Sequence, residues 1–120
     1  MSTKIPRLLT VNLEGKLYRV GYKVVTEDMK SLGLRKNPHI MTFNIAEWIF
    51  LPENQVVPGN GDYGGIWLAI SLSNARRLRE YMLCKHERET KIFEALIDRV
   101  LYSNSYRVKT NGLMLVEEKR

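Results

Sequence analysis

Residues 61–75 read Gly-Asp-Tyr-Gly-Gly-Ile-Trp-Leu-Ala-Ile-Ser-Leu-Ser-Asn-Ala, and this stretch predicts three elements in succession. Its glycines predict a loop, and the apolar run from Ile66 to Ile70 predicts a buried strand. Ser71 and Ser73 are typical helix caps, so a helix is predicted from about Asn74 to Lys85. The side chains at helical spacing that would face the core are Ala75, Leu78, Tyr81 and Met82.

A strand and a short helix are predicted upstream of this stretch. Residues 17–25 alternate between apolar and polar side chains, which is typical of a half-buried strand. Residues 11–13 could pair with it across a turn at 14–16. Thr26 can cap a short helix over residues 26–34, and Gly33 would end that helix.

The remaining segments complete an α+β pattern. Residues 45–51 fit either a short helix or a strand, and residues 52–65 predict a loop. A strand is predicted over 91–97, with an extension through 100–102. Asn111-Gly112 is typical of a two-residue turn that would join 106–110 to 113–116 as a hairpin. Together these segments predict an α+β fold with about five or six strands in small, mostly antiparallel sheets and two or three helices.

Length and composition limit the class of protein. A chain of 120 residues predicts a single domain over residues 1–120, and 44% hydrophobic with 27% charged residues is typical of soluble globular proteins. No apolar run approaches the roughly 20 residues of a membrane helix, so no membrane partner is expected. Cys84 is the only cysteine and the first residues carry no apolar signal core, so a cytoplasmic location is expected. The net charge of +6 favours a phosphate-bearing partner.

Three familiar chemical motifs are disfavoured by their context. Residues 59–64 match G-x-G-x-x-G, but in dinucleotide-binding folds that string follows a strand and opens a helix, whereas here the strand comes after it. Cys84 and His86 are two positions apart on a predicted helix and therefore do not face each other. With one cysteine and two separated histidines, no metal site is expected.

The order of these elements resembles the ADP-ribosyltransferase superfamily over about residues 17–85. A strand carrying Arg19 is followed by a short helix that ends Ser31-Leu32-Gly33-Leu34. The stretch 61–69 is similar to that family's D-[FY]-G-x-G-[IFY]-[YW]-L pattern, and a helix with the early alanine Ala75 follows it. The resemblance implies an ADP-ribosyltransferase-like fold that holds NAD in a cleft between two small sheets. It also implies bond breaking through an oxocarbenium-like state.

The resemblance further implies roles for individual residues. Arg19 would anchor the ribose or phosphate of NAD, with the fixed donor fork that this role needs, and would belong to the catalytic set. Gly65 would let the NAD backbone approach closely, and Trp67 would pack against the nicotinamide. Ser71 or Ser73 would be the polar residue near that ring. A protein or a nucleic acid would accept the ADP-ribose.

The catalytic glutamate is where the sequence departs from the family pattern. The family usually places a glutamate on a late strand, where it stabilises the cationic transition state. Glu94, Glu117 and Glu118 are available, and none belongs to an E-x-E motif. Glu94 lies within the predicted strand 91–97 and is taken as the candidate. Either this glutamate is unorthodox, or the fold is retained without the chemistry.

The alternative hypothesis is a non-enzymatic module that binds nucleic acid or a protein partner. Its motivation is the basic charge of the predicted helix and of the last predicted hairpin. The residues that would contact phosphates are Arg76, Arg77, Arg79, Arg107 and Lys109.

Overall fold

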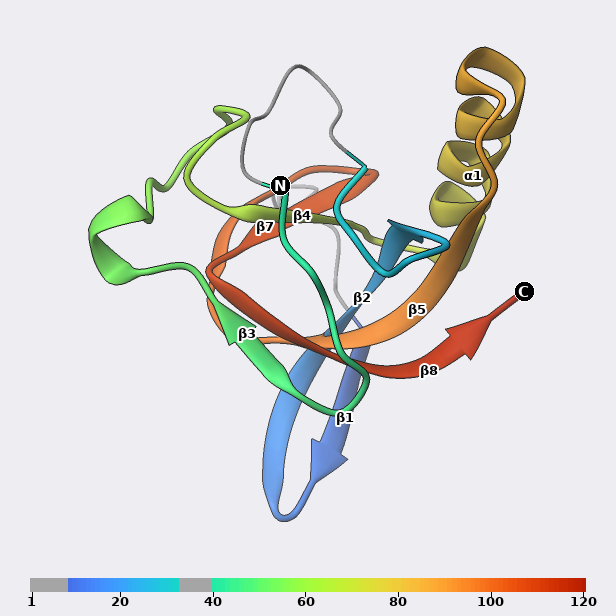
Figure 1. The fold of residues 1–120 in the computed structure, drawn as a ribbon. Helices are drawn as coiled ribbons and strands as arrows, with labels where there is room; N and C mark the ends of the chain where they lie inside the picture. Colours follow the sequence, from blue (N-terminus) through green and yellow to red (C-terminus); the bar gives the residue numbers. More distant parts are fainter. Residues whose placement is uncertain (1–8, 33–39) are drawn as a thin grey trace, which may run out of the picture.

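A computed structural model describes residues 9–32 and 40–120, and it shows one curled antiparallel sheet with a helix packed against it (Figure 1). Within these residues the eight strands are β1 (Leu9–Leu13), β2 (Lys16–Thr26), β3 (Trp48–Phe50), β4 (Ile66–Ala69), β5 (Thr90–Ile97), β6 (Val100–Ser103), β7 (Arg107–Thr110) and β8 (Gly112–Lys119). The helix is α1 (Leu72–His86), and a short 3-10 turn, η2, covers Glu53–Gln55.

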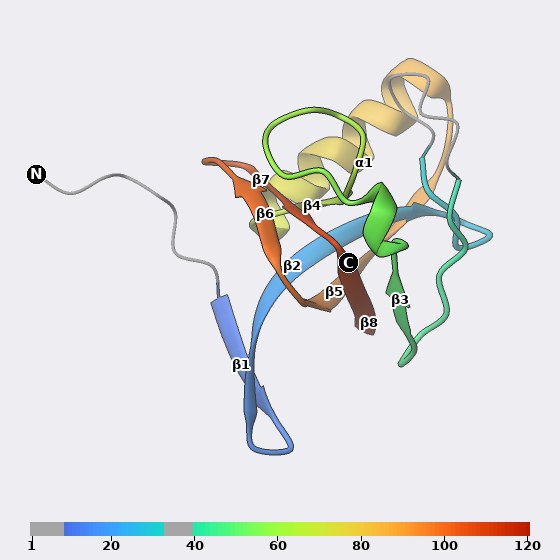
Figure 2. The ribbon, with the colours of Figure 1, turned by 90° about the vertical axis from the view of Figure 1, so that its left-hand side faces the viewer.

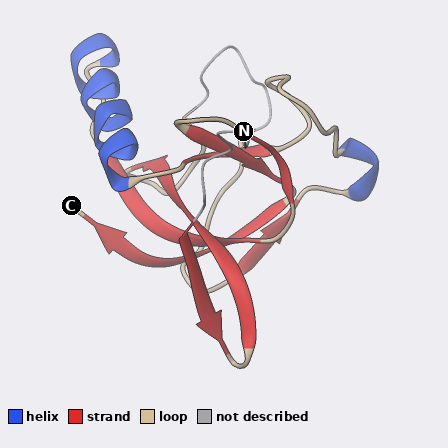
Figure 3. Cartoon of the chain, turned by 180° about the vertical axis from the view of Figure 1, so that it is seen from behind, coloured by secondary structure: helices blue, strands red, loops and turns tan. Residues whose placement is uncertain are grey.

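The strand order explains why the sheet curls. The path runs β3-β8-β5-β2-β4-β7-β6, and β1 pairs with β2 outside this path. β7 and β8 lie near opposite ends of the path, yet only Asn111 separates them in the chain. The sheet must therefore bend until its two ends meet at Asn111, and the bend is visible from the side and from behind (Figures 2 and 3).

Each face of the sheet carries an apolar cluster. The concave face encloses a core of side chains from β2, β4, β5, β7 and β8, and Phe43 closes it from the loop before β3. The opposite face packs against α1, whose Ala75 is buried there beside Val24 and Leu96. Because successive strand residues point to opposite faces, β2 and β4 supply side chains to both clusters.

The sequence predicted several of these elements correctly. The buried strand at 66–70 and the strand at 91–97 are confirmed by β4 and β5, and Ser71 caps α1 by accepting a hydrogen bond from the Asn74 amide at 3.1 Å. The 14–16 turn is confirmed, and residues 52–65 form the predicted loop apart from η2. The segment 45–51 contains the strand β3. Among the described residues, no helix has the length and apolar character needed to cross a bilayer.

The short helix predicted over 26–34 is wrong in its described part, 26–32. β2 extends to Thr26, and the chain then makes a tight turn in which the Thr26 hydroxyl accepts a hydrogen bond from the Lys30 amide at 2.9 Å. Met29 takes a left-handed conformation with φ 66°, and Ser31 pairs with Met41. The capping residue therefore closes a turn instead of opening a helix. Gly33 and Leu34 lie outside the described residues.

The hairpin predicted at Asn111-Gly112 is also wrong. β7 pairs with β4 and β6, whereas β8 pairs with β5 and β3. A two-residue hairpin of this kind needs a positive φ at its central residues, and Gly112 has none. A Cβ on Gly112 would lie 2.1 Å from Cδ1 of Phe50, so the glycine admits the neighbouring ring. The residue pair is a corner of the sheet, not a turn between paired strands.

Asn111 holds this corner through its side chain. It is 6% exposed, its Oδ1 accepts a hydrogen bond from the Arg99 amide at 2.9 Å, and its Nδ2 donates to Asp98 Oδ2 at 3.0 Å. We expect Asn111→Ala to lower the free energy of unfolding by about 2 kcal/mol, because the Arg99 amide and the Asp98 carboxylate both lose their hydrogen bond to this buried side chain. Urea unfolding measures this change. The exposed Asn60→Ala is the control and should shift stability by less than about 0.5 kcal/mol.

Candidate functional site

The candidate site is a cavity where β2 and β4 separate. These strands share a single residue pair, Tyr22 with Ala69, and then diverge. A cavity of about 640 Å³ opens at this divergence. Its walls come from β2, β4, the loops around Met41 and Leu51, α1 and the turn before β7. The charged lining residues among those described are Lys23, Asp62, Arg77 and Arg107.

Lys23 bridges the divergence between the two strands. It lies between Tyr22 and Val24 of the helix-facing cluster, so its own side chain leaves β2 on the concave side. Its Nζ donates a hydrogen bond to the Trp67 carbonyl at 2.8 Å and lies 5.6 Å from the centre of the Phe43 ring. Burial of the amine lowers its pKa to about 8. None of the ion pairs among the described residues includes Lys23.

Trp67 forms the aromatic wall on the other side of β4. The guanidinium of Arg107 lies 3.9 Å from the centre of its ring, and Tyr102 meets it edge to face at 6.0 Å. Its indole Nε1 donates to the Asp62 carbonyl at 3.2 Å. The ring and the guanidinium are therefore held in a fixed stack within the cavity lining.

The loop before β4 is held in place by Lys109. This lysine is fully buried, and its Nζ donates hydrogen bonds to the carbonyls of Val57 at 2.7 Å and Gly59 at 3.1 Å. Burial lowers its pKa, and the nearby charge of Asp62 acts in the opposite direction. The lysine stem packs against Gly65, where a Cβ would lie 2.4 Å from Lys109 Cγ. The loop residues Asp62–Gly65 thus form a defined wall of the cavity.

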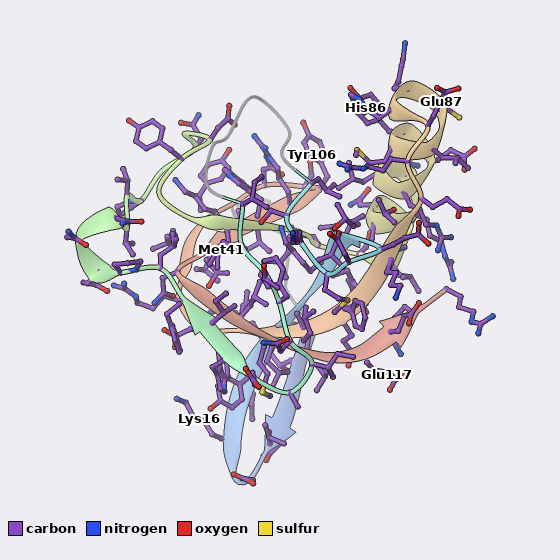
Figure 4. All side chains as sticks on the ribbon, viewed as in Figure 1. Lys16, Met41, His86, Glu87, Tyr106 and Glu117 are labelled. Carbon is purple, nitrogen blue, oxygen red and sulfur yellow. The ribbon has the colours of Figure 1, made fainter. Side chains whose placement is uncertain are left out.

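Two exposed tyrosines complete the lining. Tyr63 is 68% exposed and Tyr106 is 60% exposed, and both line the cavity together with the partly buried Met41. Figure 4 places Met41 and Tyr106 in the upper part of the molecule, whereas Lys16 lies on the β1–β2 hairpin at the opposite end. The cavity therefore combines apolar walls, aromatic rings and an excess of positive charge.

The structure brings together some of the residues implied by the family resemblance but not others. Gly65 and Trp67 line the cavity. Arg19 is exposed on β2 between Thr10 of β1 and Ile97 of β5, outside the cavity lining. It is separated from Lys23 by four residues of strand, or about 13 Å.

The implied serines and glutamate also lie outside the lining. Ser71 is occupied as the N-cap of α1, and Ser73 is exposed on the first turn of that helix. Glu94 pairs across the sheet with Tyr22 and lies 3.9 Å from the Lys119 ammonium. Because its neighbours Phe93 and Ala95 belong to the concave core, Glu94 points to the opposite face from Lys23.

The residues of the nucleic-acid hypothesis do not form one surface. Lys109 is fully buried, and Arg107 is stacked on Trp67. The guanidinium of Arg76 donates hydrogen bonds to the Arg120 carbonyl at 2.6 and 3.0 Å. Arg77 lines the cavity, whereas Arg79 does not. The basic charge is therefore divided between a loop anchor, an aromatic stack, the chain end and the cavity.

Neither Lys23 nor Asp62 was predicted to belong to the NAD site. Alternation along 17–25 places Lys23 on the same strand face as Arg19, and that was the only available signal for it. The divergence of β2 from β4, which makes Lys23 rather than Arg19 a lining residue, depends on long-range pairing. Among the described residues, no group of three or more His, Cys, Asp or Glu could hold a metal. Comparison with protein-family models, curated proteins and solved structures gives no match to this chain.

Gly64 tests whether the loop wall is defined by close packing. Its φ is +83°, and an added Cβ would lie 2.5 Å from Cβ and 2.8 Å from the amide nitrogen of Val57. We expect Gly64→Ala to lower the free energy of unfolding by about 2–3 kcal/mol through strain and clash together. The matched control is Gly15→Ala, which has a similar φ of +81° and open space around it. If urea unfolding shows the same loss of unfolding free energy for Gly64→Ala and Gly15→Ala, the close contact with Val57 contributes nothing to the loss.

Burial of Lys23 predicts a pH-dependent stability. Below pH 8 the amine is protonated in both states; between about 8 and 10.5 the folded protein loses the proton first. The unfolded chain then binds more protons, so the free energy of unfolding should rise by up to about 1.4 kcal/mol per pH unit in this window. Urea unfolding of the wild type minus that of Lys23→Met, at pH values from about 7 to 10, isolates this contribution. A difference in unfolding free energy that does not change between about pH 7 and 10 would contradict the lowered pKa of Lys23.

Proposed function

We propose that this chain binds NAD or a related nucleotide in the cavity between β2 and β4. The observation that carries the proposal is the combination, in one lining, of the Trp67–Arg107 stack with a second guanidinium, that of Arg77, and the amine of Lys23. A nucleotide offers the two features that such a lining recognises, a flat ring and a phosphate. The volume of about 640 Å³ falls within the usual range of ligand sites, about 300–1,000 Å³.

The charge of the lining supports an anionic ligand. Among the described residues, the lining contains three basic residues, Lys23, Arg77 and Arg107, and one acidic residue, Asp62. Apolar walls from Leu32, Leu68 and Leu78 reduce the local dielectric, which strengthens the attraction of a guanidinium for phosphate. Arg77 has no hydrogen bond or ion pair to another described residue, so its five donors are available to a ligand.

Transfer of ADP-ribose to a macromolecule is the finer form of this proposal. The expected chemistry needs an acidic group beside the ribosyl carbon, where positive charge develops. Glu94 lies on the other face of the sheet from Lys23 and outside the lining, whereas Asp62 belongs to the lining. We therefore assign Asp62, in place of Glu94, as the acid for this reaction. The ADP-ribosyltransferase-like fold remains part of the proposal.

Calorimetry with NAD tests the proposal through matched arginine variants. We expect Arg77→Ala to weaken NAD binding roughly tenfold or more, because a charge-assisted hydrogen bond contributes about 1.5–3 kcal/mol. Arg79→Ala is the control on the same helix, since Arg79 lies outside the lining, and it should leave the affinity unchanged. Arg19→Ala should also leave it unchanged.

Two results would contradict the proposal. One is the absence of NAD, ADP-ribose and AMP binding to the wild type in the millimolar range. The other is a loss of affinity in Arg79→Ala or Arg19→Ala as large as in Arg77→Ala, because these side chains do not line the cavity. In that case the attraction of the protein for NAD would come from its overall charge of +6 and not from specific contacts in the cavity.

A further inference from the structure

The lysines of the described chain differ in what holds their amines. Lys30 lies 3.6 Å from the Asp28 carboxylate, and Lys119 lies 2.9 Å from that of Glu117. Lys109 donates to two carbonyls and is near the charge of Asp62. Each of these three amines therefore faces either a carboxylate or two carbonyl acceptors.

Lys23 is different because its surroundings suit a neutral amine. The described residues offer its Nζ one acceptor, the Trp67 carbonyl, and the nearest ring is the buried Phe43. An ammonium has three N–H donors, whereas a neutral amine has two and a lone pair, so a neutral amine needs fewer acceptors from the protein. Burial lowers the pKa of this amine to about 8, in the direction that the geometry requires.

The second feature of Lys23 is its place in the cavity lining. Lys23 lines the same cavity as Arg77, Arg107 and Trp67. A lysine desolvated in a largely apolar pocket is a usual setting of a nucleophilic amine that forms an imine with a carbonyl compound. The two arginines provide a place for phosphate elsewhere in the same cavity.

We propose that Lys23 is a nucleophile that forms an imine with the aldehyde of a ribose that carries a 5-phosphate, as in ADP-ribose. The inference rests on the proposed function for the nucleotide class of this ligand. The ribose ring opens to its aldehyde, and the Nζ lone pair attacks the aldehyde carbon. The carbonyl oxygen takes up the two protons that the amine gives up and leaves as water, while the C=N bond forms. No oxidant or reductant is needed for this condensation.

The test is reductive trapping with ADP-ribose as the probe. The full chain is incubated with ADP-ribose and cyanoborohydride, which reduces an imine to a stable secondary amine. Peptide mass spectrometry then locates the adduct. We expect it on Lys23, in preference to exposed lysines such as Lys16 and Lys85. NAD has no free aldehyde, so it should give no adduct by itself and should protect Lys23 when present in excess.

Two variants provide matched controls. Lys23→Arg keeps the positive charge and removes the nucleophilic amine, so it should abolish the adduct. Lys16→Arg changes an exposed lysine of the same strand and should leave the labelling of Lys23 unchanged. The distribution of label over the wild-type lysines decides the question even if Lys23→Arg fails to fold.

The outcomes separate this inference from the proposed function. One outcome is that calorimetry shows NAD binding while ADP-ribose labels the exposed lysines as strongly as Lys23. That result would contradict the role of Lys23 as a nucleophile and would leave the proposed nucleotide site intact. If free ribose labels Lys23 as efficiently as ADP-ribose and NAD gives no protection, the phosphorylated ligand class is overturned. Selective labelling by ADP-ribose with protection by NAD supports both.

Discussion

The site depends on a single strand pair, Tyr22 with Ala69, beyond which β2 and β4 separate. Strands that separate leave backbone groups without sheet partners, and a buried carbonyl in that position is costly unless something donates to it. Lys23 satisfies the Trp67 carbonyl across the opening at 2.8 Å. This hydrogen bond therefore gives the Trp67 carbonyl a donor and also places an amine in the cavity wall. A carbonyl-bridging lysine is a compromise in which the backbone gains a donor and the lysine loses hydration.

Lys109 and Lys23 serve the cavity in different ways. Lys109 donates to the carbonyls of Val57 and Gly59 and so fixes the loop that carries Asp62 and Gly65. Gly65 has no side chain, and this absence makes room for the Lys109 stem. Lys109 is thus a structural cation with two acceptors, whereas Lys23 has one acceptor and borders the cavity. The difference in acceptor number is consistent with a structural role for Lys109 and the proposed chemical role for Lys23.

Local pattern predicted the parts of the fold that local physics determines. Alternation identified β2, the apolar run identified β4, and serine capping identified α1, because each depends on residues within a few positions. The failures occurred where distant contacts override a local preference. Thr26 is paired with Thr90 in the sheet and therefore caps a turn instead of a helix. The same holds for the candidate site. Gly65 and Trp67 were predicted from the local sequence 61–69, whereas the place of Lys23 in the cavity lining depends on which strands separate.

The placement of charges also constrains how a nucleotide would lie in the cavity. Trp67 and Arg107 point to the side of the sheet opposite the concave core, since Ile66, Leu68 and Val108 fill that core. Lys23 points to the concave side, beside Phe43. A phosphate placed against Lys23 would favour its ammonium form and remove the lone pair that imine formation needs. The phosphates therefore belong with Arg77 and Arg107, and the ribose end belongs with Lys23. The lining of the cavity includes Lys23 from one side of the sheet and Trp67 and Arg107 from the other, so one ligand could contact both groups.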